Sequence, residues 1–131
     1  MENNFKIEII SPEKIIFSDD VKLVTLPSYE GDMSILNNHI SIITFLRPGV
    51  VKVQTNENSY NDFFVEDGTI EYFNDTLVIL SASAISIKDL TKDFMEKLSK
   101  DTVEKLSKKD ITDHERYILN HKLDTIKEIR V

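Results

Sequence analysis

Two carboxylates, Glu30 and Asp32, flank Gly31 in a segment that ends on a histidine, His39. Paired carboxylates can serve acid–base catalysis or bind a cation, and a histidine can act as a general base. Gly31 can take a positive φ, and a tight turn around it would leave both acids in water, without the enclosure that shifts carboxyl pKa values. No serine in a recognisable nucleophile setting accompanies the histidine, and the chain has no cysteine. We therefore predict no catalytic residue and interpret the two acids as turn residues.

Two residues of this region have open interpretations. His39 is the single histidine in residues 1–84, and it is either buried with a hydrogen bond or part of an interface with another protein. Arg47 precedes Pro48-Gly49, a pair that predicts a sharp reversal of the chain. Because arginine is enriched at protein interfaces, Arg47 is either an interface anchor or a residue of a solvated corner. The residue types alone leave both pairs of alternatives open.

The composition limits the class of the protein. With 131 residues, 40% hydrophobic and 30% charged, the chain is one ordinary domain or a small domain with an appendage. The lack of cysteine excludes disulfides and Cys-ligated zinc, and three scattered histidines form no metal-ligand pattern, so we expect no metal and no cofactor. No apolar stretch approaches the roughly 20 residues that span a bilayer, and residues 1–4 show no secretory signal. We expect a soluble, intracellular protein.

The charge is unevenly distributed along the chain. The net charge is −7, and residues 1–84 hold 13 acidic and 5 basic side chains, whereas residues 85–131 hold 10 acidic and 11 basic ones. Phosphate backbones are bound by Lys and Arg side chains that neutralise them. The acidic first part therefore argues against a nucleic-acid partner.

Short strands are predicted throughout residues 5–80. Phe5, Ile7 and Ile9 alternate with polar residues, which is the period-two pattern of a strand with one solvated face. Further apolar runs follow at spacings near ten residues, which is typical of a β-sandwich or barrel. The predicted strands are 5–9, 15–17, 21–26, 40–46, 50–53, 60–65, 69–73 and 77–80, separated by polar turns that include 18–20, 56–59, 66–68 and 74–75.

Helical periodicity replaces this pattern after Ser83. Residues 89–109 place one apolar stripe on a charged helix. We expect Phe94 and Met95 to pack in the core between this helix and its neighbours. Thr112 and Glu115 then fit a capping box at the start of a second amphipathic helix. Two such helices joined by a short polar turn predict an antiparallel hairpin. The expected fold is mainly β plus α, with a β domain at 1–84 and a helical hairpin at 85–131.

Four motifs follow one another along the chain, namely Glu30-Gly31-Asp32-Met33-Ser34-Ile35-Leu36-Asn37-Asn38-His39, Leu46-Arg47-Pro48-Gly49, Val65-Glu66-Asp67-Gly68 and Ile79-Leu80-Ser81-Ala82-Ser83-Ala84. In this order and spacing they resemble the epsilon subunit of F-type ATP synthases, which is called delta in mitochondria. Ser34 stands where that family usually has Gly, and Asn37-Asn38 stands where Pro-Gly is common. Asn38 can keep the turn, because Asn tolerates a positive φ.

The resemblance implies an N-terminal β-sandwich, a C-terminal helical hairpin and a role without catalysis. It implies a rotor subunit that binds the gamma subunit and the ring of membrane c subunits and so couples proton-driven rotation to ATP synthesis. Glu30, Gly31 and Asp32 would face the ring loops, and the segment up to His39 with its strand neighbours would border gamma, with Arg47 as a further interface residue. The implied location is peripheral, on the cytoplasmic face of the bacterial inner membrane.

The hairpin is the part in which that family varies, because in some members it extends into the catalytic head and inhibits. Basic residues of the second helix could then meet the alpha and beta subunits of the head. Some members bind ATP through an Asp and an Arg, but here those positions hold Thr91 and Phe94, so we expect no ATP binding. The candidate head contacts are Arg116, Lys122, Lys127 and Arg130.

One alternative from another class remains. A stand-alone β-sandwich that binds a ligand or a protein, with the hairpin as a dimerisation device, would share the same strand and helix pattern. The chain has no Trp and only 8% aromatic residues, which disfavours an aromatic ligand face. The ordered motifs favour the ATP synthase subunit.

Overall fold

The computed structural model describes residues 4–129, which contain ten strands, a single 3-10 turn and two α-helices. The β part is followed by the turn Ile87–Asp89 and the helices α1 (Lys92–Leu106) and α2 (Asp113–Glu128). The strands are β1 (Phe5–Ile10), β2 (Ile15–Val21), β3 (Leu23–Ser28), β4 (Gly31–Ile35), β5 (Ile42–Leu46), β6 (Gly49–Asn56), β7 (Ser59–Val65), β8 (Gly68–Phe73), β9 (Thr76–Leu80) and β10 (Ile85–Ser86).

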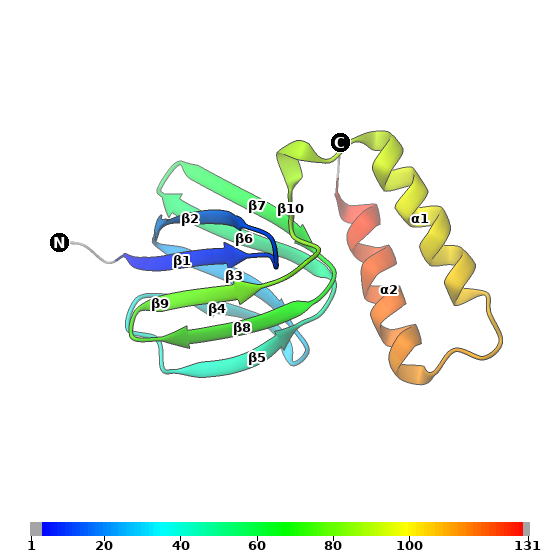
Figure 1. The fold of residues 1–131 in the computed structure, drawn as a ribbon, viewed down its shortest axis with the longest axis horizontal. Helices are drawn as coiled ribbons and strands as arrows, with labels where there is room; N and C mark the ends of the chain where they lie inside the picture. The colour runs from blue at the N-terminus through cyan, green and yellow to red at the C-terminus, as the bar shows by residue number, and fades with distance from the viewer. Residues whose placement is uncertain (1–3, 130–131) are drawn as a thin grey trace.

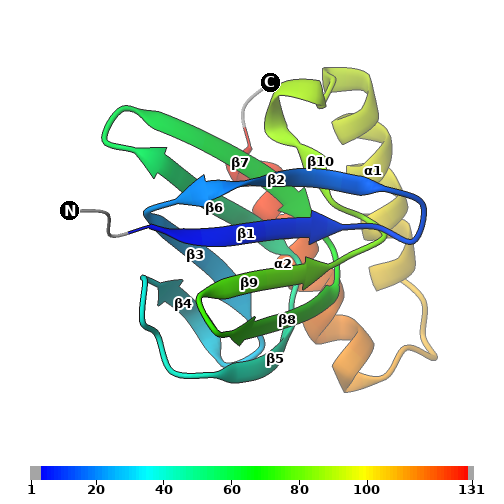
Figure 2. The ribbon, with the colours of Figure 1, turned by 60° about the vertical axis from the view of Figure 1, so that its left-hand side comes forward.

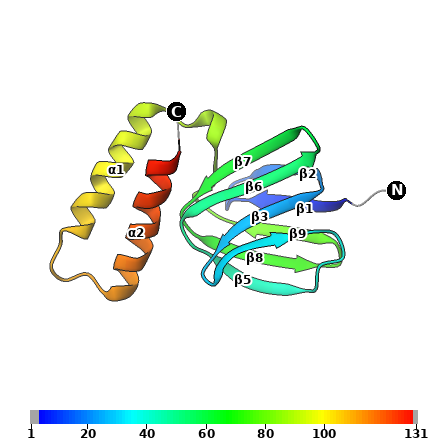
Figure 3. The ribbon, with the colours of Figure 1, turned by 180° about the vertical axis from the view of Figure 1, so that it is seen from behind.

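The strands form a single sheet that folds over into two layers. Its order is β10-β7-β6-β3-β5-β8-β9-β1-β2, with β4 paired to β3, and β1 and β9 run parallel. β3 joins the layers, because its first half pairs with β6 whereas Ser28 pairs with Leu46 of β5. Figure 1 has β1, β9 and β8 toward the viewer, and Figure 3, from behind, has β7, β6 and β3 in front. The predicted β-sandwich is confirmed.

The alternating side chains of the strands fill the space between the layers. In β1 the side chains of Phe5, Ile7 and Ile9 are buried, whereas Lys6 is exposed. Burying an aliphatic or aromatic side chain of this size contributes about 1.5–3 kcal/mol. The buried core of the sandwich comprises Phe5, Ile7, Ile9, Val21, Val24, Leu26, Ile35, Leu46, Val51, Val53, Phe63, Val65, Ile70, Tyr72, Leu77, Ile79 and Ala84.

One predicted turn is wrong and three are confirmed. Residues 18–20 continue β2, because the antiparallel ladder pairs them with residues 6–8 of β1. Their polar side chains are exposed on an edge strand, so the ladder forms without burying a charge. The turns near 56–59, 66–68 and 74–75 join β6–β7, β7–β8 and β8–β9. Asn74 and Asp75 both have positive φ, 53° and 57°, as a tight two-residue hairpin turn requires.

The helices form the predicted hairpin at one end of the sandwich. Figures 1 and 3 show α2 lying between the sandwich and α1, with the two helices side by side, and in Figure 2 α2 lies behind the strands. The Thr112–Glu115 capping box is present at the start of α2. α1 begins three residues later than predicted, after its cap Thr91, and none of the helices in residues 4–129 has the length and apolar composition needed to cross a membrane.

A second, smaller core holds the hairpin. Phe64 of β7, Leu90, Met95 of α1 and Ile126 of α2 are buried together, which confirms the expectation for Met95. The expectation for Phe94 is wrong, because its side chain is 40% exposed. Neighbouring helical residues point about 100° apart, so the face that buries Met95 turns Phe94 outward. β10 pairs with β7, so the sheet continues to Ser86, and the division at residue 84 stays a prediction.

Candidate interaction surfaces

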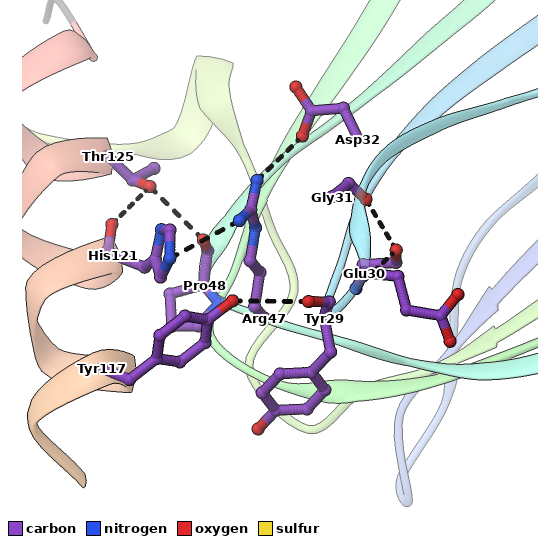
Figure 4. Close-up of polar contacts among 10 residues, drawn as sticks. Tyr29, Glu30, Gly31, Asp32, Arg47, Pro48, Tyr117, His121 and Thr125 are labelled. Carbon is purple, nitrogen blue, oxygen red and sulfur yellow. Dashed lines mark hydrogen bonds and ion pairs between the residues drawn. The ribbon is translucent and has the colours of Figure 1, made fainter. Parts of the chain in front are cut away.

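The corner between β3 and β4 is built by local hydrogen bonds. The Ser28 hydroxyl donates to the Gly31 carbonyl over 2.6 Å, and the Glu30 amide donates to the Ser28 hydroxyl over 3.3 Å. Gly31 has a φ of 119°, the positive value expected from the sequence. Glu30 lies in the turn, as the sequence predicted, whereas Asp32 belongs to β4 and pairs with Pro27 of β3. Both side chains are exposed, and Glu30 points away from α2 (Figure 4).

Arg47 connects this corner to α2. Its Nη2 lies 3.2 Å from Oδ1 of Asp32, and its Nη1 lies 3.5 Å from Nε2 of His121 (Figure 4). The Arg47 amide also donates to the Pro27 carbonyl over 2.9 Å, which fixes the start of the Pro48 corner. Arg47 is therefore half-buried within the chain. Both sequence interpretations, an interface anchor and a solvated corner, missed this helix partner, which lies 74 residues away.

Two more hydrogen bonds complete the contact with α2. The Tyr117 hydroxyl donates to the Tyr29 carbonyl over 3.4 Å, and the Thr125 hydroxyl lies 3.5 Å from the Pro48 carbonyl (Figure 4). The Tyr117 ring stands edge-on to the His121 ring with centroids 4.4 Å apart. We call this set the corner–helix contact. It consists of Tyr29 and Asp32 from the β3–β4 corner, Arg47 and Pro48 from the adjoining β5–β6 corner, and Tyr117, His121 and Thr125 from α2.

Lys122 makes a separate link between hairpin and sandwich. It is only 7% exposed, and its ammonium forms an ion pair with Glu66 in the β7–β8 turn. Of the other candidate head contacts, Arg116 and Lys127 are exposed on α2, and Arg130 lies outside the described residues. In this arrangement Lys122 is turned toward the sandwich, whereas Arg116 and Lys127 can meet a partner directly.

His39 lies at the opposite end of the sandwich from the corner. Along the β5–β8 pair, Ile42 opposes Tyr72 near His39, whereas Leu46 opposes Gly68 next to Arg47. The His39 ring lies edge-on to the Tyr72 ring at 5.6 Å, and its Nδ1 lies 2.7 Å from the Ile40 carbonyl oxygen. His39 is half-buried and has a hydrogen bond. Because it lies at the other end of the β5–β8 pair, the structure does not bring it together with Glu30, Asp32 and Arg47.

Tyr72 and Asp75 hold the turn beneath His39. The Tyr72 hydroxyl donates to Oδ1 of Asp75 over 2.7 Å, and the Asn38 amide donates to the same oxygen over 2.9 Å. Burial, followed by the hydrogen bond to Asp75, raises the pKa of Tyr72 to about 12. The same hydrogen bond and the Asn38 amide lower the pKa of Asp75. Asn38 has a φ of 62°, so it supplies the positive φ expected at this position.

An exposed apolar surface covers the outer side of β5, β8 and β9. Ile43 is 74% exposed and Phe73 is 66% exposed, and the strand registers place both side chains on the face away from the core. The sequence carried a signal of this exposed apolar surface, because the run 42–46 has apolar residues on both faces of β5 instead of on one. Exposed apolar patches mark interaction sites. We call this surface the outer face; its members are Ile43, Phe45, Phe73 and Leu80, with Ile40 beside them.

A shallow groove continues the outer face toward the hairpin. It has a volume of about 660 Å³, and its apolar lining includes Ile10, Pro12, Phe45 and Leu80. Within residues 4–129 there is no group of three His, Asp or Glu side chains that could hold a metal ion. Among residues 4–129, the side-chain hydrogen bonds of His39 and His121 join them to the Ile40 carbonyl and to Arg47, and to no nucleophile. The arrangement can provide a surface for a protein partner.

Residues 4–87 match the family model described as "ATP synthase, Delta/Epsilon chain, beta-sandwich domain". The chain is 42% identical to the ATP synthase epsilon chain of Pelagibacter ubique over 98% of this chain and 99% of the relative. It is 30% identical to the ATP synthase epsilon chain of Parvibaculum lavamentivorans over 99% and 98% of the two chains.

Two solved structures share the fold at low sequence identity. A chain of the Euglena gracilis mitochondrial ATP synthase (OSCP/F1/c-ring) has a TM-score of 0.76 at 16% identity and covers 97% of this chain and 79% of that one. A chain of the Tetrahymena thermophila mitochondrial ATP synthase (central stalk/c-ring) has a TM-score of 0.63 at 17% identity and covers 94% and 93%. Both likenesses extend over the sandwich and the hairpin.

Proposed function

The chain belongs to the family of ATP synthase delta/epsilon chains, and from this premise we propose that it is a non-catalytic rotor subunit of an F-type ATP synthase. It binds the gamma subunit and the c-ring and couples proton-driven rotation to ATP synthesis. The observation that carries this proposal is the similarity to a bacterial epsilon chain along both the sandwich and the hairpin. Nothing in the described residues favours the alternative of a stand-alone binding module.

The gamma subunit binds to the outer face. Ile43 and Phe73 lie on this face beside Ile40, which directly follows His39, the residue assigned to the gamma border. A rotor contact must bear torque, and side chains on paired strands are held more rigidly than loop residues. Burial of these exposed apolar side chains provides the binding energy, and the sheet fixes their positions.

The c-ring meets the corner at Glu30, Gly31 and Asp32. Glu30 points into solvent, and the Arg47–Asp32 ion pair holds the corner in one conformation. Bound to the ring in this way, the subunit is peripheral and lies on the cytoplasmic face of the bacterial inner membrane. The two proposed contacts use different parts of the sandwich, so one subunit can touch the ring and gamma together.

The hairpin is the adjustable unit in this proposal. Arg116 and Lys127 are exposed on α2 and can approach the acidic surface of a catalytic head, as can Arg130, which lies outside the described residues. Lys122 joins them only after its ion pair with Glu66 opens. The sandwich, proposed as unit 1–84, keeps its contacts in either hairpin position.

Co-purification tests the proposal. A tagged copy of the chain, expressed in its own cells, should recover the gamma, alpha and beta subunits. The double variant Ile43→Asp/Phe73→Asp should lower gamma recovery at least tenfold, since burying a charge in an apolar interface costs more than about 1.4 kcal/mol. Tyr60→Asp is the matched control, because Tyr60 is 59% exposed but lies on β7 in the other layer.

Two results would contradict the proposal. Recovery of none of these subunits by the folded parent chain would remove the assignment as a rotor subunit. Equal loss of gamma in the double variant and in Tyr60→Asp would keep that assignment but would move the gamma site away from the outer face.

A further inference from the structure

The contact between the hairpin and the sandwich depends strongly on polar groups. Its apolar part is the cluster of Phe64, Leu90, Met95 and Ile126, with Ile85, Ile87, Leu98 and Ile129 packed against it, and the stacked rings of Tyr29 and Tyr117. The rest consists of the corner–helix contact and the Lys122–Glu66 ion pair. Such a contact weakens when the protonation of one member removes or repels its polar partner. The hairpin is then held less tightly in its docked position against the sandwich.

His121 takes one defined protonation state in this contact. Arginine has only hydrogen-bond donors, so the nitrogen that faces Arg47, Nε2 of His121 at 3.5 Å, must be the acceptor. An Nε2 that accepts belongs to a neutral imidazole with its proton on Nδ1. Protonation would place an N–H and a positive charge against the guanidinium, which Asp32 holds in place from the other side.

We propose that His121 is a pH-sensitive latch. Its neutral imidazole holds α2 against Arg47 and Asp32 of the sandwich, and its protonation releases the hairpin. The charged groups around it are shared between the two units. Arg47 and Asp32 face it from the corner, and the Tyr117 ring covers one side. The hollow of about 240 Å³ beside His121 is lined by the charged residues Asp32, Arg47, Lys52, Asp124 and Glu128.

The direction of the pH response follows from these surroundings. Burial, and then the charge of Arg47, lower the pKa of His121 from 6.5, whereas Asp124 and Asp32 act in the opposite direction. A base whose pKa is lower in the docked state stabilises docking at pH values above its undocked pKa. This stabilisation is lost as the pH falls through the lowered value. Acid therefore favours the undocked hairpin.

Distance measurements on the isolated full chain test the latch. The chain has no cysteine, so spin labels at Asn58→Cys in the β6–β7 turn and Asn120→Cys on α2 report on one distance. The pH window from about 8 to about 5.5 spans the ordinary histidine pKa and stays above that of ordinary carboxyl groups. We expect the docked population to fall across this window and to recover when the pH is raised again.

Variants assign the response to one residue. His121→Gln keeps a neutral acceptor and should make the docked population independent of pH in this window. His39→Gln is the matched control, because His39 lies at the far end of the sandwich, and this variant should keep the full response. Arg47→Gln should lower docking already at the upper end of the window.

The outcomes separate the latch from a general acid effect. An unchanged pH response in His121→Gln would overturn the proposal, as would a docked population that stays constant in the parent chain. If His121→Gln is undocked throughout, the NMR titration of the His121 ring in the parent chain decides. A ring that titrates at or above the ordinary histidine value while the hairpin is docked would also overturn it.

Discussion

At the scale of single residues, the three glycines allow close or unusual backbone conformations for different reasons. Gly31 has a positive φ in open space, as its place in the turn predicts. Gly49 instead lies against the Pro27 ring, so a side chain there would collide with that ring. Gly68 combines both conditions, because its φ is +146° and an added Cβ would meet the Leu80 carbonyl oxygen. The sequence indicated the first reason and could not reveal the other two, which depend on distant segments.

Comparing two glycine substitutions separates backbone strain from a steric clash. Gly31→Ala should cost about 1–3 kcal/mol of unfolding free energy, the usual cost of a strained φ. Gly68→Ala should cost more, because the clash is with a backbone oxygen that no side-chain rotation can relieve. Urea unfolding of both variants and of the parent chain measures the difference. Equal losses in the two variants would show that the sheet at Leu80 yields without cost.

At the scale of elements, local signals in the sequence predicted most of the fold. Alternation defined the strands, and the Thr112 capping box marked the start of α2 correctly. The errors arose where tertiary contacts override local preference. Residues 18–20 form a strand because β1 pairs with them, and β4, which was interpreted as part of a turn, forms because β3 pairs with it. β10 is too short to carry a periodic signal.

The candidate sites were less predictable than the fold. The positive φ values of Gly31 and Asn38 could be predicted, because they depend on residue type and turn position. The contact of Arg47 with His121 could not, since nothing local indicates which helix residue will face a corner 74 residues away. The same holds for the pairing of Lys122 with Glu66, which turns a predicted surface cation inward.

The ion pair of Lys122 gives a prediction for the hairpin as an element. Lys122→Met should reduce docking of α2 by about 1 kcal/mol, because Glu66 loses a partner but keeps part of its hydration. Lys127→Met is the control, since it removes the same charge from an exposed position of the same helix. The labelled distance between Asn58→Cys and Asn120→Cys measures docking in both. Similar docking in the two variants would assign the attachment to the apolar cluster instead.

At the scale of the whole molecule, the chain combines a rigid unit with a movable one. The sandwich core is continuous from Phe5 to Ala84 and contains no residue of either helix. The hairpin has its own small cluster and is attached through groups that can be protonated or separated. The proposed partner surfaces for gamma and the c-ring both lie on the rigid unit, so a change of hairpin position would leave them in place.

Removing residues 87–131 tests this division directly. The shortened chain keeps every residue of the sandwich core and the β10–β7 pairing, so it should stay folded with a cooperative thermal transition. It should still recover the gamma subunit, because the outer face is complete without the helices. The deletion uncovers Phe64, and Phe64→Thr in the shortened chain counters aggregation without touching the outer face.

Assembled enzyme carrying the shortened chain should hydrolyse ATP faster if the basic face of α2 contacts the head. Loss of gamma recovery by the folded, shortened chain would show that the hairpin itself carries part of the rotor interface.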